Sequence, residues 1–436
     1  MKPGPGLRRH LTAGSAFLLT RVTNALFVLV QLALVARGFP AGEAAAFFVY
    51  WTVVWVAAMF IRFGFDQFVP KLVARAAVSG DPTDLAGFRN VIQRTLALVC
   101  IGVPLVLVVV IPPADLREIA IGTGLCVMGA AAMATSFVLA GLLKGYGHVA
   151  ASGWSTGFLA PAFSAAAVPI AHAVGGSWTT IAAATTVGLA GAAGVTTLMS
   201  VRLLGSDRVS AALLLRARPG LDRDVLPTGL LFGIAELTSW LPLWMAPVLG
   251  ASDQATAGLY AAIRVSAAFS WAFLAVATVA TPLIAAALAR YDYARLRSVL
   301  KRSAAAGAAT TAPLALFGML AASDLLGLVD ASYDAYAFTL VVLIAARLVD
   351  AATGPLVEAL VLGGHARWEL ANQLLGAGVI VIVGVGLEPS AGVEAFAWAY
   401  AIAFSTQNAL RVLQIGWLLR TKWQAVPSPK APRDPY

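Results

Sequence analysis

The stretch GLYAAIRVSAAFSWAFLAVATVATPLI, residues 258–284, consists of apolar and small residues with one charged residue, Arg264. A helix rises about 1.5 Å per residue, so about 20 apolar residues cross the ~30 Å hydrocarbon core of a bilayer. The whole chain has the same character, with 60% hydrophobic and 12% charged residues. Soluble proteins carry about 25% charged residues. The sequence therefore predicts an all-α, polytopic membrane protein.

Apolar stretches of this length recur along the whole sequence, and we interpret about twelve of them as membrane-spanning helices. An even number of spans places both ends of the chain on the same side of the membrane. The predicted spans are residues 13–36, 44–62, 93–112, 119–143, 153–173, 178–201, 226–249, 256–286, 303–322, 335–362, 369–387 and 393–419.

The distribution of lysine and arginine agrees with twelve spans and with cytoplasmic N- and C-termini. Basic residues collect in cytoplasmic loops of membrane proteins. With the N-terminus inside, the outer loops hold only Arg37 and Arg117, and the other loop cations fall on the cytoplasmic side. This topology, with attraction to anionic lipid, accounts for the formal net charge of +9 without a nucleic-acid partner.

The two halves of the sequence resemble each other. A shift of 212 positions superposes Gly38 on Gly250 and Pro70 on Pro282 without a gap. Chance similarity between Ala-rich membrane helices is the alternative explanation. A true repeat predicts two six-helix lobes around a cleft. The expected division is an N-lobe at 1–204, a cytoplasmic connecting loop at 205–224, a C-lobe at 225–420 and a cytoplasmic tail at 421–436.

Five charged residues fall near the middle of predicted spans: Arg21, Glu236, Arg264, Arg347 and Asp350. A charge at the centre of a membrane helix costs roughly 2.5–3.5 kcal/mol on insertion scales, so these side chains should face protein or water rather than lipid. Arg347 and Asp350 lie three residues apart on one helix face and could neutralise each other. Glu236 could do the same for Arg21 or Arg264.

The three arginines outnumber the two carboxylates, and this excess favours an anionic ligand. The planar guanidinium group donates two parallel hydrogen bonds and stays charged when buried, which suits a phosphate or pyrophosphate. Glu236 and Asp350 are then candidates for charge partners or for binding a coupling ion.

Other functional classes lack their usual sequence features. Cys100 and Cys126 have no neighbouring Cys or His at metal-ligand spacing, so neither a metal site nor a disulfide is expected. The sequence has no P-loop, and no cofactor is predicted. The predicted outer loops are no longer than about fifteen residues, which leaves little material for an external catalytic domain. The sequence therefore predicts a transporter rather than an enzyme.

Four stretches carry a family resemblance. GLYAAIR (258–264), followed by Thr281-Pro282, resembles the eighth helix of the bacterial polysaccharide-biosynthesis flippases of the Wzx or O-antigen type. GFDQFVPKLVA (64–74) resembles the end of their second helix. YDAYAFTLVVLIAARLVDAATGP (333–355) and LEPSAGVEAFAWAYAIA (387–403) look similar to their tenth and twelfth helices. These flippases belong to the superfamily of multidrug extruders and lipid II flippases.

The resemblance implies a MATE-like fold and a flippase in the bacterial cytoplasmic membrane. Family members move undecaprenyl-pyrophosphate-linked oligosaccharides through a cationic cavity by alternating access. In this chain Arg264, Arg21 and Arg347 would then contact the pyrophosphate. Partners would be the lipid-linked oligosaccharide, membrane lipids and glycan assembly proteins. Cytoplasmic basic residues would gather the anionic lipid, namely Lys71, Arg75, Arg290, Arg295 and Arg297.

Two other functions remain as alternatives at this stage. A multidrug or cation antiporter of the same superfamily would need an anionic cavity, which the arginine excess disfavours. A membrane glycan polymerase or ligase would need a large external loop, and none is predicted.

Overall fold

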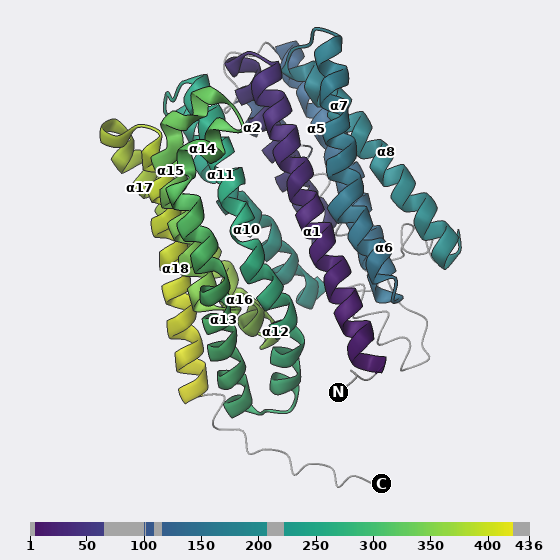
Figure 1. Ribbon diagram of the computed structural model, residues 1–436, viewed down its shortest axis with the longest axis vertical. Helices are drawn as coiled ribbons and strands as arrows, with labels where there is room; N and C mark the ends of the chain where they lie inside the picture. The colour runs from purple at the N-terminus through teal and green to yellow at the C-terminus, as the bar shows by residue number, and fades with distance from the viewer. Residues whose placement is uncertain (1–4, 65–99, 101, 109–115, 207–221, 422–436) are drawn as a thin grey trace. The chain divides into compact units, whose positions relative to one another are not determined.

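The computed structural model describes residues 5–64, 100, 102–108, 116–206 and 222–421 of the 436-residue chain. These residues fold almost entirely into helices (Figure 1), which confirms the predicted all-α class. The chain divides into two compact units. Unit 1 comprises Met1–Tyr260 with Leu328–Asp330, and unit 2 comprises Ala261–Gly327 with Ala331–Tyr436.

Unit 1 is built around a central helix, α2, that is buried along nearly its whole length. Helices α5, α8 and α10 pack against α2, while α1 packs mainly against the segment α6, η1 and α7. The elements are α1 (Pro5–Gly38), α2 (Ala41–Arg62), α5 (Leu116–Gly145), α6 (Val149–Trp154), η1 (Ser155–Leu159), α7 (Ala160–Ala173), α8 (Trp178–Leu204) and α10 (Asp222–Val248).

Polar side chains inside unit 1 form hydrogen bonds between helices. The Trp244 indole N–H of α10 donates to the Thr52 hydroxyl of α2 at 2.8 Å. The Tyr50 and Thr186 hydroxyls, on α2 and α8, lie 3.0 Å apart. Because an unpaired polar group in an apolar interior costs free energy, these bonds fix the rotation of each helix around α2.

The predicted span 153–173 contains a local irregularity. A π-helical turn, η1, separates α6 from α7, and Pro161 follows directly. Proline lacks the N–H that would continue the α-helical ladder, so the backbone widens into i→i+5 spacing. Gly157 lies within this turn, and a Cβ there would come 2.8 Å from the Thr20 carbonyl oxygen. The wide turn and this glycine let α1 approach closely.

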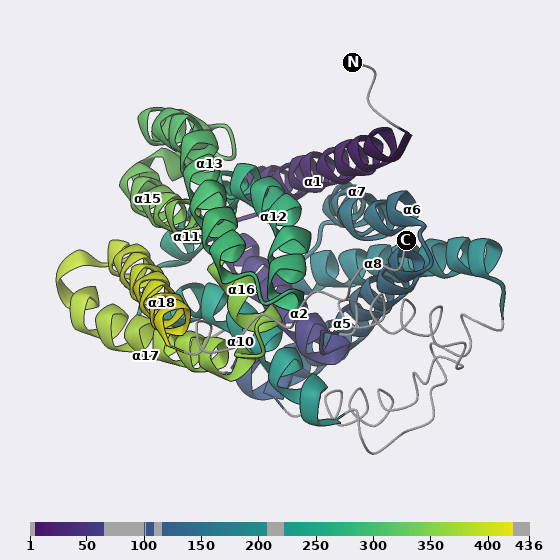
Figure 2. The same ribbon diagram turned by 90° about the horizontal axis from the view of Figure 1, so that it is seen from below.

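Unit 2 contains the remaining helices, and α11 runs across the division between the units. Helices α17 and α18 form its most extensive pair and lie side by side in both views (Figures 1 and 2). The elements are α11 (Asp253–Ala268), α12 (Trp271–Ala289), α13 (Tyr293–Leu320), α14 (Ala322–Gly327), η2 (Ala331–Tyr336), α15 (Ala337–Thr353), α16 (Leu356–Leu362), α17 (Ala366–Ala391) and α18 (Glu394–Arg420).

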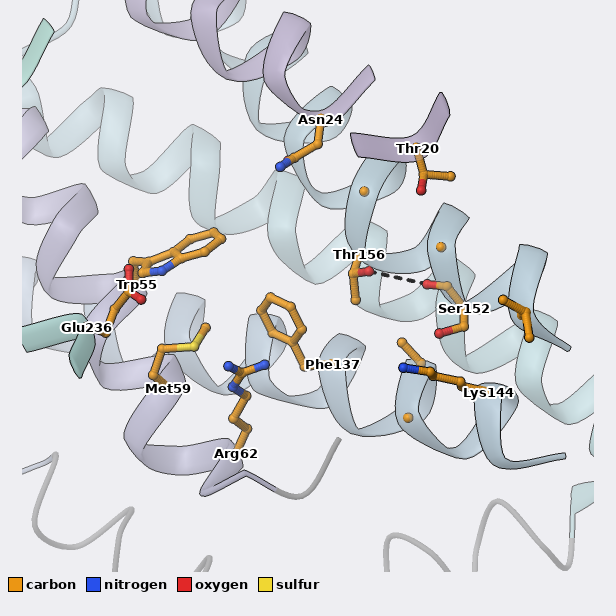
Figure 3. A pocket seen from close by; sticks show the side chains of 15 residues that line it. Thr20, Asn24, Trp55, Met59, Arg62, Phe137, Lys144, Ser152, Thr156 and Glu236 are labelled. Atoms are coloured by element: carbon orange, nitrogen blue, oxygen red, sulfur yellow. Dashed lines mark hydrogen bonds between the residues drawn. The ribbon is translucent and has the colours of Figure 1, made fainter. Parts of the chain in front are cut away.

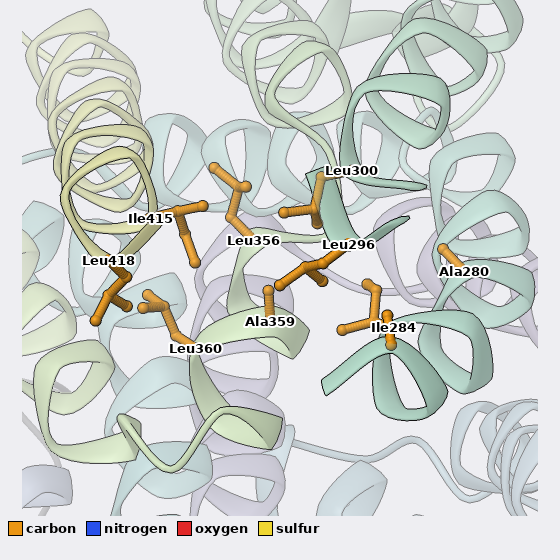
Figure 4. Packing of buried hydrophobic residues seen from close by; sticks show 10 residues of the cluster. Ala280, Ile284, Leu296, Leu300, Leu356, Ala359, Leu360, Ile415 and Leu418 are labelled. Carbon is orange, nitrogen blue, oxygen red and sulfur yellow. The ribbon is translucent and has the colours of Figure 1, made fainter. Parts of the chain in front are cut away.

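An apolar cluster ties together four helices of unit 2 (Figure 4). The short helix α16 supplies its centre, where Leu356, Ala359 and Leu360 are buried. The other members come from α12, α13 and α18: Ala280, Ile284, Ala287, Leu296, Leu300, Ile415 and Leu418. This packing holds α16 in place although it is only seven residues long.

The prediction of one continuous helix over 256–286 was wrong. Two helices, α11 and α12, are separated at Phe269 and Ser270. The N–H groups of these two residues donate to carbonyl oxygens three residues earlier, at 3.1 Å each, which ends the α-helical ladder.

The span predicted at 335–362 is also divided, here by sequence features that break helices. Gly354 adopts φ 83° between α15 and α16, and Pro355 follows it. Proline supplies no N–H, and a positive φ is accessible to glycine at little cost. A Cβ on residue 354 would also come 3.1 Å from the Ala304 Cβ. Gly354 therefore serves both the turn and the packing against α13.

Nine helices within the described residues are long and apolar enough to span a membrane. They account for nine of the twelve predicted spans. Of the other three, 13–36 has a described apolar part of only Val22–Gly38, and 93–112 lies largely outside the described residues. The third, α18, carries Gln407, Asn408, Arg411 and Gln414 in its apolar sequence. The chain is a multi-pass membrane protein.

The predicted lobe boundaries remain a prediction. The two compact units separate at residue 260, which leaves α10 within unit 1. The expected connecting loop at 205–224 lies mostly outside the described residues, as does the tail at 421–436.

Candidate functional site

Unit 1 contains a pocket of about 260 Å³ between helices α1, α2, α5, α10 and the segment α6–η1 (Figure 3). Its lining combines aromatic, hydroxyl, amide and charged side chains with small residues. The lining residues are Thr20, Asn24, Trp55, Met59, Arg62, Phe137, Ala140, Gly141, Lys144, Val149, Ser152, Gly153, Thr156, Gly157 and Glu236.

Helical periodicity places the larger side chains on the pocket wall. Trp55, Met59 and Arg62 are spaced four and three residues apart on α2, so they share one face of that helix. On α5, Phe137 and Lys144 are seven residues apart, which is about two turns. Figure 3 shows the Arg62 guanidinium beside the Phe137 ring.

The π-helical segment supplies the hydroxyl groups of the pocket. Ser152 lies on α6 and Thr156 on η1. The Thr156 hydroxyl donates to the Ser152 carbonyl oxygen at 3.3 Å, so its oxygen lone pairs remain available to a ligand. The widened turn of η1 thus brings polar atoms to the wall of a pocket inside an apolar bundle.

Positive charge exceeds negative charge among the lining side chains. Arg62 and Lys144 are cations, and Glu236 is the carboxylate. The Arg62 guanidinium lies 4.7 Å from the centre of the Phe137 ring, a cation–π contact that holds it against the wall. Glu236 accepts a hydrogen bond of 3.0 Å from the Trp240 indole N–H, one turn along the same helix. The Lys144 side chain is exposed.

The structure places the predicted central charges in both units. Glu236 lines the unit 1 pocket, where Arg62 and Lys144 are the cations. Arg21 follows Thr20, another lining residue, but its own side chain lies outside the described part. Arg264 is half-buried on the part of α11 that belongs to unit 2. Its predicted pairing with Glu236 stays a prediction.

Arg347 and Asp350 have different neighbours, although they share a helix face. The Arg347 guanidinium lies over the Tyr400 and Phe404 rings of α18, 5.1 and 5.2 Å from their centres. Asp350 accepts a hydrogen bond of 3.2 Å from the Asn408 amide. The spacing of Arg347 and Asp350 suggested a direct ion pair between them. That pair is not among the ion pairs of the described residues.

Of the five residues predicted to gather ligand at the cytoplasmic side, three are described. Arg290, Arg295 and Arg297 are exposed around the turn from α12 to α13, where Asp292 accepts a hydrogen bond from the Arg295 backbone N–H at 2.9 Å. Lys71 and Arg75 lie outside the described residues.

Unit 2 contains a buried ion pair that was not predicted from the sequence. Arg411 on α18 binds Glu369 on α17 through two contacts, Nη2 to Oε1 at 2.5 Å and Nε to Oε2 at 2.9 Å. Arg411 is only 3% exposed and Glu369 is fully buried. This bidentate geometry is the strongest that the two groups can form.

Amide side chains surround this ion pair and extend its hydrogen bonding. Gln373 donates to Glu369 at 2.9 Å, and Arg411 donates to the Asn408 amide oxygen at 3.1 Å. Asn372 and Gln414 exchange two hydrogen bonds of 2.9 Å across the helix pair. The spacing 369, 372, 373 on α17 and 407, 408, 411, 414 on α18 is a polar stripe at helical periodicity, which could have predicted the contact. Within the described residues, no cluster of His, Cys, Asp and Glu is suited to hold a metal ion.

We expect the Arg411–Glu369 pair to be required for stable folding of unit 2. Replacing either partner alone, as Arg411→Met or Glu369→Gln, leaves its partner or the surrounding amides unsatisfied in an apolar interior. Breaking a buried pair in this way costs about 3–5 kcal/mol. Thermal unfolding of the purified protein in detergent should show a lower midpoint for each single variant.

The double variant Arg411→Met/Glu369→Gln should recover part of that loss, because it removes both charges. Arg420→Ala, which removes an exposed cation in the last turn of α18, should behave like the unmodified protein. A single variant at Arg411 that unfolds at the unmodified temperature would contradict the assigned role of the pair.

The fold has close counterparts among solved structures, although no protein-family model and no curated protein sequence matches the chain. An inward-facing multidrug resistance MATE family transporter of the MOP superfamily aligns with a TM-score of 0.71 and 15% identity, over 94% of this chain and all of that chain. A MOP superfamily transporter from Pyrococcus furiosus gives a TM-score of 0.66 and 14% identity, over 95% and 96% of the two chains.

A mutant of the Vibrio cholerae MATE transporter VcmN aligns with a TM-score of 0.65 and 14% identity, over 94% of this chain and 96% of that one. Identities this low establish a shared architecture and leave the substrate open. The multi-pass helical chain described above therefore has the fold of the MATE transporters of the MOP superfamily.

Proposed function

We propose that this protein is a flippase of the bacterial cytoplasmic membrane. Its substrate would be an oligosaccharide linked to undecaprenyl pyrophosphate, moved between leaflets by alternating access. The observation that carries this proposal is the positive charge of the unit 1 pocket. Its lining includes two cations, Arg62 and Lys144, and one carboxylate, Glu236.

Charge is expensive inside a membrane protein, so its sign at a binding site indicates the sign of the ligand. The two cations Arg62 and Lys144 outnumber Glu236 in the pocket, and the chain has further cations at Arg264 in α11 and Arg347 in α15. An anionic headgroup would neutralise this excess. A cationic drug would add to it, which disfavours a multidrug antiporter.

One solved neighbour supports the idea that pocket charge separates functions within this fold. The Pyrococcus furiosus transporter is described as having a binding pocket of reverse polarity that suggests a different function. If this chain carries a different class of substrate on the same fold, the Pyrococcus furiosus transporter would be a second example of such a change. Other neighbours are described as multidrug resistance transporters. The pocket, rather than the fold, must distinguish the two classes.

In this mechanism the exposed basic residues first gather the anionic lipid at the cytoplasmic surface. Arg290, Arg295 and Arg297 would act at the α12–α13 turn, together with Lys71 and Arg75. At a later step of the cycle, after the headgroup has left the unit 1 pocket, Arg21, Arg264 and Arg347 would contact the pyrophosphate at mid-depth while the prenyl chain stays in lipid. Rearrangement of the two lobes would open the site to the other side.

The helix breaks supply places where such a rearrangement can bend the chain. Backbone hydrogen bonding is interrupted at Phe269–Ser270 and at Gly354–Pro355. Such interruptions are tolerated at membrane depth where protein or water satisfies the freed groups. Glu236 or Asp350 would bind a coupling ion or orient a neighbouring cation during the cycle.

We expect purified protein in proteoliposomes to move prenyl-pyrophosphate-linked saccharide between leaflets. The measurement is the fraction of labelled lipid that becomes accessible to an impermeant reagent. Lys144→Glu should abolish this movement because it reverses the charge of an exposed lining cation, and Lys144→Ala should slow it. Arg202→Ala, which removes an exposed cation at the end of α8, should transport normally.

The same vesicles test the antiporter alternative with a fluorescent cationic drug. We expect that neither the unmodified protein nor Lys144→Glu moves the cationic drug across the vesicle membrane. Rapid extrusion of the cation with no movement of the lipid-linked saccharide would overturn the proposed function.

Arg264 provides a second test, aimed at the predicted pyrophosphate contact in unit 2. Arg264→Ala should insert and accumulate normally, yet lipid-linked glycan should build up on the inner leaflet. Arg264→Lys should restore only part of the export, because lysine keeps the charge but loses the planar fork. Full export by a well-expressed Arg264→Ala protein would remove this residue from the site.

A further inference from the structure

We infer that the unit 1 pocket binds one sugar together with the phosphate bonded to it, that is, a glycosyl phosphate. This inference rests on the proposed function and assigns a part of the lipid-linked substrate to a defined place. The pocket would hold the saccharide residue next to the pyrophosphate. The remaining sugars would lie outside it.

The size of the pocket accommodates a sugar ring with its phosphate. The pocket has a volume of about 260 Å³ and is partly open to its surroundings. A pyranose ring with a phosphate group fits this space, and further sugars of the substrate can extend through the opening. A bare phosphate would leave most of the pocket unfilled.

The apolar wall matches one face of a sugar ring. Trp55, Met59 and Phe137 present flat or flexible apolar surface to the pocket (Figure 3). A pyranose exposes C–H groups on its ring faces and hydroxyl groups around its edge, so an aromatic ring covers a face without desolvating the hydroxyls. A phosphate or a metal ion gains no hydrogen bond or coordination from this apolar wall.

The polar groups of the pocket match the edge of the ring. The Asn24 amide provides two donors and an acceptor, and the Ser152 and Thr156 hydroxyls each donate or accept. Figure 3 shows Asn24 above the Phe137 ring and the two hydroxyl residues on the side opposite Trp55. Neutral polar groups of mixed donor and acceptor character are what hydroxyl recognition requires.

The phosphate of the ligand would bind next to a cation of the pocket, Lys144. In Figure 3, Lys144 lies on the same side as Ser152, whereas Glu236 lies beside Trp55 on the other side. A phosphate near Lys144 is therefore kept away from the carboxylate. The exposed lysine gains a charge-assisted hydrogen bond, and the sugar extends from it along the aromatic wall toward Trp55.

Binding of soluble probes to the purified protein in lipid nanodiscs tests this inference. The probes are glucose 1-phosphate, galactose 1-phosphate, N-acetylglucosamine 1-phosphate, the corresponding free sugars and inorganic phosphate, measured by titration calorimetry. At least one sugar phosphate should bind tenfold or more tightly than both its free sugar and inorganic phosphate.

Variants separate the two halves of the site. Trp55→Ala and Asn24→Ala should weaken the sugar phosphate about three- to tenfold, as expected for one aromatic or polar contact, and leave inorganic phosphate unchanged. Lys144→Ala should weaken both ligands. Trp55→Phe should retain much of the affinity, which distinguishes lost stacking from misfolding. Trp398→Ala, which removes a partly exposed tryptophan of α18 in unit 2, should change neither ligand.

Equal affinity for inorganic phosphate and every sugar phosphate, or a sugar-phosphate affinity that Trp55→Ala leaves intact in a folded protein, would overturn the inference. The flipping assay shows separately which idea has failed. Movement of lipid-linked saccharide with no sugar-phosphate binding preserves the proposed function and removes this subsite. Sugar-phosphate binding with no movement of the lipid preserves the subsite and removes the flippase.

Discussion

The cost of a charge within a membrane is the constraint on which both units depend. A guanidinium or carboxylate at membrane depth must be paired, or must face a polar cavity. Unit 2 adopts the first solution, because Arg411 and Glu369 neutralise each other and amide groups complete their hydrogen bonds. Unit 1 adopts the second, because the mid-helix carboxylate Glu236 lines a pocket that also contains hydroxyl and amide groups and the cations Arg62 and Lys144. We therefore assign a structural role to the first arrangement and a ligand to the second.

The irregular helices follow from the same constraint. Backbone groups released by a proline or a turn must find partners inside the protein. The π-helical turn η1 is placed beside the pocket, where its residues Thr156 and Gly157 line the wall. The break at Gly354 lies against α13, with Ala304 close to the glycine. Two of the departures from α-helical geometry thus lie beside the polar pocket or directly against a neighbouring helix.

Much of the fold could be predicted from the sequence because apolar stretches of membrane-spanning length are a direct physical signal. The ranges 44–62 and 178–201 agree closely with α2 and α8. The break within 256–286 could not be predicted, because the residues at the break, Phe269 and Ser270, are not the proline or glycine that usually ends a helix. The length of an apolar segment can be seen in the sequence, whereas the end of a helix depends on local backbone hydrogen bonds.

The candidate site was less accessible to sequence reasoning. Glu236 was predicted as a central charge and does line the pocket. From the sequence, Arg62 and Lys144 belong to the loop cations of the cytoplasmic side, because charge at the end of a span is the usual topology signal. Asn24, Trp55 and Phe137 carry no motif, and only tertiary packing brings them together. The role of Arg264 remains a prediction.

The most direct test of the account is a cryo-electron microscopy structure of the protein in lipid nanodiscs with prenyl-pyrophosphate-linked saccharide. We expect headgroup density in the unit 1 pocket, with phosphate next to Lys144 and the first sugar against Trp55. A substrate that binds elsewhere and leaves this pocket empty, or a pocket occupied by a cationic drug when both compounds are present, would contradict it.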